Sequence, residues 1–319
     1  MLEWLRSDHV VGADGRVVSW TNPAHPGHSY PEAAGLLLGL LAHEGLTPDP
    51  VRERIVRGII SDTSAAGGCG KQGREYVFDA AMVLNGLLEH ERSGGSLPDP
   101  LLPCRLFGFI ADNLLKRQAA SGLAGGDRKR WSLSYGAHLL KVVRALSLYH
   151  RMKSEQRCKS LIGQIAEDLV PLYSAGRFHI HADSTETYVH SHCYAVSGLL
   201  CLERDGLSSV TPIIGGCAAW LAQIQESQGG IREWHDGDRS YGEVHADCTA
   251  QAVRIWAHVD RAAFADEIIR ALEFLAGQQS SAGGLYYAPG CADENTWATI
   301  FAVQAVRWAS EGACEQQLI

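Results

Sequence analysis

Side chains that can transfer protons near neutral pH gather at a few places in this 319-residue sequence. The densest group is a run of four histidines, His179, His181, His190 and His192. Carboxylates and phenols recur at comparable positions, at the starts of other apolar segments. Such residues support general acid–base catalysis. The candidate catalytic residues are Asp79, His190, His192, Tyr30, Glu32, Tyr135, Tyr194 and Asp247.

Aromatic and polar residues lie close in sequence to these candidate catalytic residues. Tyr76 and Asp293 also occur at the starts of apolar segments. A sugar ring stacks its apolar face on Trp or Tyr, and its hydroxyls need many hydrogen-bond partners. Arg130 can receive a substrate carboxylate, and Lys71 is a weaker candidate for that role. The pattern therefore favours a saccharide pocket. The candidate substrate-binding residues are Trp20, His28, Arg130, Trp131, His138, Trp234, His245, Tyr287, Asn295 and Trp297.

A role in helix capping can explain two of the three candidate carboxylates, Glu32 and Asp247, but not Asp79. Ser29 and Glu32 have the spacing of a capping box, with Ser29 as the N-cap, and Asp247 suits an N-cap position. Asp79 leads directly into an apolar run, where a buried carboxylate is costly without a purpose. Asp79 is therefore the favoured catalytic carboxylate.

His190 and His192 can share a site only under one condition. Residues two apart on one continuous helix point in nearly opposite directions. A helix that begins between them, with Ser191 as its N-cap, would bring both imidazoles to the same pocket. We expect this arrangement, in which the two histidines act as proton-transfer groups.

A weak internal repeat indicates which elements position these residues. Six segments begin with a polar or aromatic residue and continue as small and aliphatic residues nearly all round, which is typical of helices buried on every side. Each follows a stretch with one apolar stripe at helical spacing, such as Val51, Ile55 and Ile59. The segments are residues 30–42, 76–88, 134–149, 188–202, 246–259 and 295–309.

Six outer-then-inner hairpins predict an all-α fold, a single (α/α)6 toroid domain over residues 1–319. Gly-rich connections such as Gly229-Gly230 and Gly283-Gly284 allow the chain to reverse between the two helices of a unit. An open solenoid of stacked pairs is the alternative architecture. The chain is short for six full hairpins, so we expect the first outer helix, beginning near Leu2, to be truncated or completed by another subunit.

The last two units, residues 220–230 and 274–284 with the helices after them, carry a Gln…Gly-Gly repeat that resembles the terpenoid cyclase and protein prenyltransferase toroids. They also resemble the six-hairpin glycosidase superfamily, which includes uronate hydrolases, polysaccharide lyases and sugar epimerases. In that superfamily a similar Phe-Asp pair on an inner helix matches Phe78-Asp79. The resemblance implies an enzyme that acts as a lyase, epimerase or hydrolase on a saccharide, most readily one that contains uronate.

The toroid families also offer a second possibility, a zinc enzyme of the prenyltransferase or lanthionine-cyclase sort that acts on a peptide or isoprenoid. Its ligands here would be His190, His192, Asp247 and Cys248. The spacing matches neither family's motif, so no cofactor is favoured. The Asp-x-Asp-Asp motif of terpene cyclisation is absent from the sequence. A noncatalytic helical-repeat protein that binds a partner is the third alternative.

The composition of the chain limits the kinds of molecule that it is expected to bind. The net charge is −8 and there is no basic block, so we expect no nucleic acid partner. No window approaches the ~20 apolar residues of a membrane span, and no signal sequence is evident, so we expect a cytoplasmic protein with a small-molecule or oligosaccharide substrate. Nine scattered cysteines predict reduced and mostly buried thiols rather than a disulfide framework.

Overall fold

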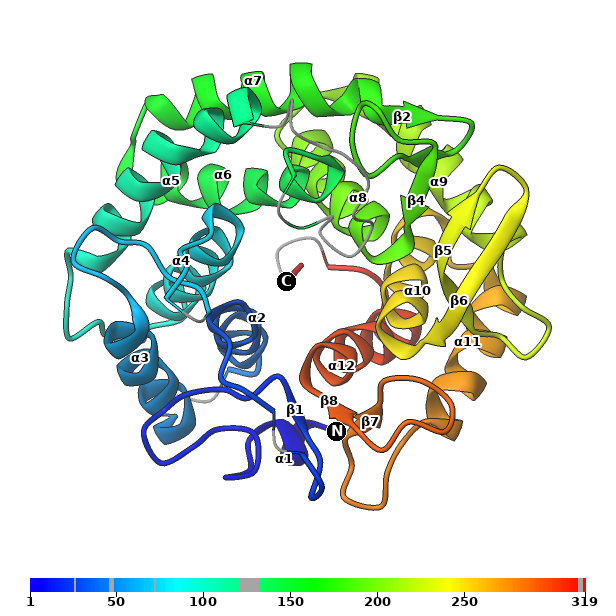
Figure 1. Ribbon diagram of the computed structural model, residues 1–319, viewed down its shortest axis with the longest axis horizontal. Helices are drawn as coiled ribbons and strands as arrows, with labels where there is room; N and C mark the ends of the chain where they lie inside the picture. Colours follow the sequence, from blue (N-terminus) through cyan, green and yellow to red (C-terminus); the bar gives the residue numbers. More distant parts are fainter. Residues whose placement is uncertain (26, 46–48, 72, 121–131, 133, 315–317) are drawn as a thin grey trace.

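The computed structural model describes residues 1–25, 27–45, 49–71, 73–120, 132, 134–314 and 318–319. Its helices form two concentric rings, and the inner helices surround a central axis (Figure 1). The inner helices are α2 (Pro31–Ala42), α4 (Val77–Arg92), α6 (Val142–Lys153), α8 (Val189–Arg204), α10 (Ala246–Asp260) and α12 (Thr296–Glu311). The outer helices are α1 (Leu2–Leu5), α3 (Pro50–Asp62), α5 (Leu102–Ala120), α7 (Arg157–Leu169), α9 (Thr211–Gln223) and α11 (Ala265–Gly277).

Burial separates the two rings as the sequence predicts. Every residue of α2 is buried. Helix α11 instead buries one stripe, formed by Ile268, Ala271, Phe274 and Leu275, and its other residues are half-buried or exposed. A helix that is apolar all round gains most from burial on every side, and an amphipathic helix gains most with one face in water. The predicted assignment of inner and outer helices is confirmed.

The ring closes between the first and the last unit, so the open solenoid is excluded. Strand β1 (Trp20–Thr21) pairs antiparallel with β8 (Glu294–Asn295), which leads into α12. The Thr296 amide donates to the Ser19 carbonyl at 3.0 Å. The Trp4 indole, on the four-residue helix α1, donates to the Glu294 carboxylate at 3.3 Å. The short first outer helix therefore still takes part in closure.

Short strands lie where the chain enters the inner helices of the last units. β4 (Glu186–Tyr188), β5 (Ile231–Asp236) and β6 (Arg239–His245) form an antiparallel sheet in that order. β4 ends at the residue before α8, and β6 ends at the residue before α10. The remaining pairs are β7 (Leu285–Tyr286) with β8, and β2 (Tyr173–Ser174) with β3 (Arg177–Phe178). The 3-10 helices among the described residues are η3 (Ala137–Lys141), η4 (Val170–Leu172) and η5 (Ser208–Val210).

The Gln…Gly-Gly repeat has a structural basis in the turns that join outer and inner elements. The Gln225 amide donates to the Gly229 carbonyl at 2.9 Å, and Gln279 makes the same contact with Gly283 at 3.3 Å. Gly229 and Gly283 both adopt positive φ angles, of 92° and 102°. Since residues with a Cβ rarely adopt this conformation, the repeat preserves a glutamine-closed turn.

All nine cysteines are free thiols, and six of them are buried. This confirms the predicted absence of a disulfide framework. Within the described part of the chain, no helix is long and apolar enough to cross a membrane.

Helices α2 and α4 approach each other closely at two glycines. A Cβ built on Gly35 would lie 2.4 Å from the Met82 carbonyl oxygen, and one on Gly86 would lie 2.3 Å from the Gly35 carbonyl oxygen. Such distances are far inside van der Waals contact, so a side chain at either position would force the helices apart.

We predict that Gly35→Ala lowers the free energy of unfolding by about 2 kcal/mol or more, because it overpacks this crossing. The matched control is Gly108→Ala on α5, where a new Cβ meets nothing within 4 Å. That variant should be neutral or stabilised by up to about 1 kcal/mol, since Ala is the better helix former. Urea unfolding of both variants tests the pair, and equal stabilities would contradict the proposed close crossing.

Candidate active site

A cavity of about 630 Å³ opens where the inner helices begin. Its wall combines carboxylates, basic residues, phenols and indoles, and it is contributed by the first turns of inner helices and the loops before them. The lining residues are Trp20, His28, Tyr30, Glu32, Lys71, Arg74, Tyr76, Phe78, Asp79, Ser132, Tyr188, His190, Asp247, Tyr287, Asp293, Asn295 and Trp297.

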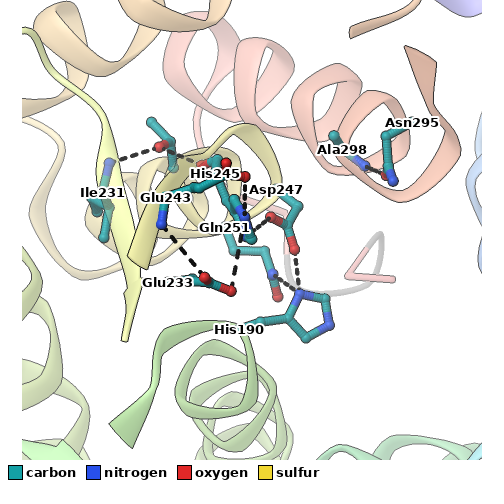
Figure 2. Close-up of polar contacts among 10 residues, drawn as sticks. His190, Ile231, Glu233, Glu243, His245, Asp247, Gln251, Asn295 and Ala298 are labelled. Atoms are coloured by element: carbon teal, nitrogen blue, oxygen red, sulfur yellow. Dashed lines mark hydrogen bonds and ion pairs between the residues drawn. The ribbon is translucent and has the colours of Figure 1, made fainter. Parts of the chain in front are cut away.

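A histidine–aspartate pair joins α8 to α10 at this cavity. His190 is the second residue of α8 and Asp247 the second residue of α10, and Nδ1 of His190 makes a short hydrogen bond to Oδ2 of Asp247 (Figure 2). The Gln251 amide lies one turn further along α10, 3.3 Å from the same nitrogen. The two side chains are 10% and 1% exposed, so water screens their interaction only weakly.

The surroundings of Asp247 keep it ionised. Burial acts to raise the pKa of the Asp247 carboxyl, but the charge and hydrogen bond of His190 and the charge of His245 outweigh it, so that the pKa is lowered. An ionised Asp247 accepts the Nδ1 proton of His190, which leaves Nε2 as the basic nitrogen of the imidazole. This is the arrangement by which carboxylates orient histidine bases in enzymes.

Tyr30 and Asp79 form a second interacting pair, between α2 and α4. Tyr30 is the N-cap of α2, and Asp79, which is 2% exposed, lies in the first turn of α4, where its charge acts on the Tyr30 phenol. Burial and then the charge of Asp79 raise the pKa of Tyr30, so the phenol stays protonated. Tyr30 also packs edge-on against Trp297, with ring centroids 5.4 Å apart.

The floor of the cavity is formed by Glu32, with the buried Tyr194 beneath it. The buried Tyr194 hydroxyl donates to the Glu32 carboxylate at 2.8 Å, and Phe78 stacks on the Tyr194 ring at 5.3 Å. On η3, Lys141 Nζ lies 4.0 Å from the centroid of the Tyr194 ring. Complete burial lowers the pKa of Lys141 well below its ordinary value.

Two basic side chains line the cavity from the loop before α4. Lys71 and Arg74 come from this connection, and Lys71 Nζ lies 5.1 Å from the centroid of the Tyr30 ring. His28 lines the same cavity, and burial together with the charge of Lys71 lowers its pKa. The cavity therefore presents fixed positive charge in addition to the carboxylates Glu32, Asp79, Asp247 and Asp293.

The structure brings thirteen of the predicted site residues to the cavity, among them Lys71, Tyr76 and Asp293. Among the catalytic candidates these are Tyr30, Glu32, Asp79, His190 and Asp247. The substrate-binding candidates that line it are Trp20, His28, Tyr287, Asn295 and Trp297. Arg130 and Trp131 lie outside the described residues.

His192 does not lie in the cavity, and the expected sharing of a site with His190 is wrong. Helix α8 begins at Val189 with Tyr188 as its N-cap, so Ser191 is no cap and both histidines lie on one helix. His192 consequently points into the core, where its Nδ1 accepts from the Phe178 amide at 3.1 Å and its ring packs against Trp220.

Five other candidates lie outside the cavity lining. Tyr135 donates to Asp168 at 2.8 Å, and His138 packs on Phe78 behind the wall. Tyr194 lies beneath Glu32, as described above. Trp234 and His245 flank the cavity, in contact with the rings of its lining residues Tyr188 and Tyr287 respectively.

Of the two roles left open for Glu32 and Asp247, the structure does not contain the capping role. The N-cap of α2 is Tyr30 rather than Ser29, and Glu32 faces the cavity floor instead of closing a capping box. The N-cap of α10 is His245, which places Asp247 inside the first turn. Asn295 does cap its helix, α12, by accepting from the Ala298 amide at 2.9 Å.

Four lining residues were not predicted: Arg74, Phe78, Ser132 and Tyr188. A signal for Tyr188 exists in the repeat, because Tyr30, Tyr76 and Tyr188 all occupy the N-cap of an inner helix. Arg74 lies in a Gly-containing connection close to Lys71, so its type and position could have identified it.

A group of potential metal ligands lies beside the histidine–aspartate pair. One ligand atom each from His245, Asp247 and Cys248 fall within 4.8 Å of one another, and all three residues are buried. His245 Nδ1 and Asp247 Oδ1 are 3.9 Å apart, and neither has a hydrogen-bond partner among the described residues. His190 and His192, both expected ligands, are not part of this group.

No protein-family model and no curated protein matches the chain. Solved structures do match. An α-amylase from Clostridium perfringens aligns with a TM-score of 0.64 at 11% identity, over 100% of this chain and 97% of the other. A glycosyl hydrolase of family 88 from Bacteroides vulgatus aligns at 0.62 and 11% identity, over 88% and 91%. The chain has the (α/α)6 toroid fold.

The toroid also aligns with ent-copalyl diphosphate synthase from Streptomyces platensis, at a TM-score of 0.58 and 17% identity, over 89% of this chain and 50% of the other. This agrees with the resemblance of the Gln…Gly-Gly units to cyclase toroids. Identities this low establish shared architecture, and the reaction has to be argued from the site itself.

The buried position of His192 gives a prediction about stability. Burial, assisted by the charge of Arg177, lowers the pKa of His192 to about 3. Since an unfolded histidine has a pKa of about 6.5, the unfolded state binds one more proton than the folded state between those values. This contribution to stability is complete above pH ~6.5 and declines as the pH falls toward 3, by about 1.4 kcal/mol per pH unit.

We predict that His192→Gln flattens the pH dependence of the unfolding free energy by that amount, because glutamine can accept from the Phe178 amide but does not titrate. Denaturant unfolding of both proteins at several pH values between 4 and 6.5 measures the slopes. Identical slopes would show that His192 is not buried in its neutral form.

Proposed function

We propose that the protein is an enzyme that removes a proton from a saccharide beside a carboxylate, as in lyase or epimerase reactions on uronate-containing glycans. The observation that carries this proposal is the His190–Asp247 pair, which opens onto a cavity that also holds Lys71, Arg74 and aromatic walls. The α-amylase and the family 88 glycosyl hydrolase among the structural neighbours support a saccharide substrate.

In the proposed reaction His190 is the general base. Its Nε2 takes the proton from the carbon next to the substrate carboxylate, and the electron pair of the broken C–H bond moves into that carboxylate. Asp247 holds Nδ1–H throughout and stabilises the imidazolium that forms. Because the pKa of Asp247 is lowered, this carboxyl is poorly suited to the protonated acid that hydrolysis requires.

Lys71 and Arg74 are proposed to bind the substrate carboxylate. Proton removal places a second negative charge on that group, and preorganised cations stabilise such developing charge more strongly in the transition state than in the ground state. The Tyr30 phenol also lines the cavity, where its oxygen can accept a hydrogen bond from a substrate hydroxyl. In a lyase the electron pair then expels the neighbouring glycosidic oxygen, and in an epimerase a proton returns on the opposite face.

We predict that His190→Ala and Asp247→Asn each lower kcat by about 10²- to 10⁴-fold, the usual range for loss of a positioned base. Tyr135→Phe is the control, because it removes a hydrogen bond away from the cavity lining. The substrates are di-, tetra- and hexasaccharides of hyaluronan, alginate and polygalacturonate. New ultraviolet absorbance reports a lyase, and deuterium uptake from solvent reports an epimerase.

Three results would overturn all or part of this assignment. New reducing ends without either signal would identify a hydrolase. Binding of the saccharides with no conversion would identify the noncatalytic binding protein. Full activity of His190→Ala would remove the histidine as base even if the substrate class holds.

The group formed by His245, Asp247 and Cys248 supports a second candidate, a zinc enzyme. The two buried ligand atoms without hydrogen-bond partners fit a metal, and the three side-chain types are those that bind zinc. Burial, and then the charge of Asp247, raises the pKa of Cys248 well above its ordinary value, which a bound cation would reverse. Bound zinc would supply a Lewis acid or an activated thiolate at this place.

Metal analysis of protein purified without chelators or a histidine tag separates the two candidates. The zinc candidate predicts about one zinc per chain, lost in Cys248→Ala and retained in Cys217→Ala, whose thiol is buried on α9. Absence of metal from the wild-type protein would eliminate this candidate and leave the acid–base proposal in place.

A further inference from the structure

One surface next to the cavity has no part in the chemistry proposed above. The antiparallel register of the β4–β5–β6 sheet places Tyr188 opposite Trp234, and Trp234 opposite Tyr241. Directly paired residues project from the same face of a sheet. Three aromatic side chains from three strands therefore form a continuous row, which we term the aromatic row.

The rings of the aromatic row contact one another. The centroids of Tyr188 and Trp234 are 4.7 Å apart, and Trp234 and Tyr241 are stacked at 6.3 Å with an interplanar angle of 16°. Tyr188 is the inner end of the row, because it lines the cavity, and the row continues outward over about two strand spacings, or ~10 Å. Figure 1 shows β4 next to α8, with β5 and then β6 further out.

The two faces of this sheet differ in burial. The opposite face carries Thr187 and His235, which are 0% and 5% exposed, and His235 packs edge-on against Trp220 of α9. On the face with the aromatic row, Trp234 and Tyr241 are partly exposed. The sheet is thus fixed to the core by one face and leaves the indole and outer phenol rings accessible on the other.

Polar side chains surround the aromatic row and hold its outer end. The Tyr241 hydroxyl donates to Glu186 in a short hydrogen bond, and the Arg239 guanidinium lies 5.2 Å from the centroid of the Tyr241 ring. A second carboxylate on this face, Asp236, accepts from the Thr185 hydroxyl at 3.1 Å. Aromatic rings in fixed orientation, bordered by hydrogen-bonding groups, match a pyranose ring with its apolar faces and equatorial hydroxyls.

We infer that the aromatic row is a second saccharide subsite, which binds the sugar units that follow a disaccharide held in the cavity. The inference rests on the proposed function, because it takes the cavity occupant to be a saccharide. Tyr188 belongs both to the cavity lining and to the aromatic row, so the two are continuous. A saccharide whose reacting unit lies in the cavity therefore extends over Trp234, and this is why we assign a saccharide to the row. The preferred substrate is therefore an oligosaccharide longer than a disaccharide.

Calorimetry tests the inference by comparing saccharide binding to the wild-type protein and to Trp234→Ala. The ligands are the di-, tetra- and hexasaccharides of hyaluronan, alginate and polygalacturonate. We expect the wild-type protein to bind a tetrasaccharide about tenfold more tightly than the matching disaccharide, and Trp234→Ala to lose that gain while disaccharide affinity is retained. Trp234→Phe should recover part of the gain, because it restores a ring. Asp238→Ala, at the tip of the same hairpin, is the control for disturbance of the hairpin itself.

The outcomes separate the inference from the function on which it rests. Equal losses for short and long ligands, or no loss at all, overturn the second subsite while saccharide binding in the cavity stands. A wild-type protein that binds none of the saccharides overturns the proposed function and the subsite together. Circular dichroism of Trp234→Ala excludes misfolding as the cause of a lost gain.

Discussion

Burial of the inner helices on all sides is the constraint on which the rest of the structure depends. A helix without a wet face can carry polar side chains only near its ends, unless each is paired within the core. The cavity therefore draws on first turns: Glu32 and His190 are the second residues of their helices, and Asp79 the third. The chemistry is concentrated at one end of the ring because the core excludes it elsewhere.

Much of the fold could be predicted from the sequence, because the repeat of buried and amphipathic segments is a local pattern. The positions of individual side chains were less accessible. A start of α8 at Val189 instead of after Ser191 was enough to turn His192 into the core, since helical direction changes by 100° per residue. The same sensitivity explains why Glu32 proved to be a floor residue rather than a cap.

Strand pairing was the part that the sequence could least indicate. Residues 186–188 and 231–236 are far apart in the chain, and short strands carry little periodicity of their own. The partnership of His190 with Asp247 likewise joins residues 57 positions apart. Both relationships arise because α8 and α10 are neighbours in the ring. The sequence around Asp247 gives no indication that its partner is on α8.

Closure by β1 and β8 has a consequence for biosynthesis. Trp20 lies in the first unit and Trp297 in the last, yet they line the same cavity. During translation the early hairpins can pack against one another, but this wall cannot exist until residues near 297 have left the ribosome. Folding therefore ends with a contact between distant parts of the chain, a slow kind of step, and the nascent chain holds an incomplete cavity until the final unit joins it.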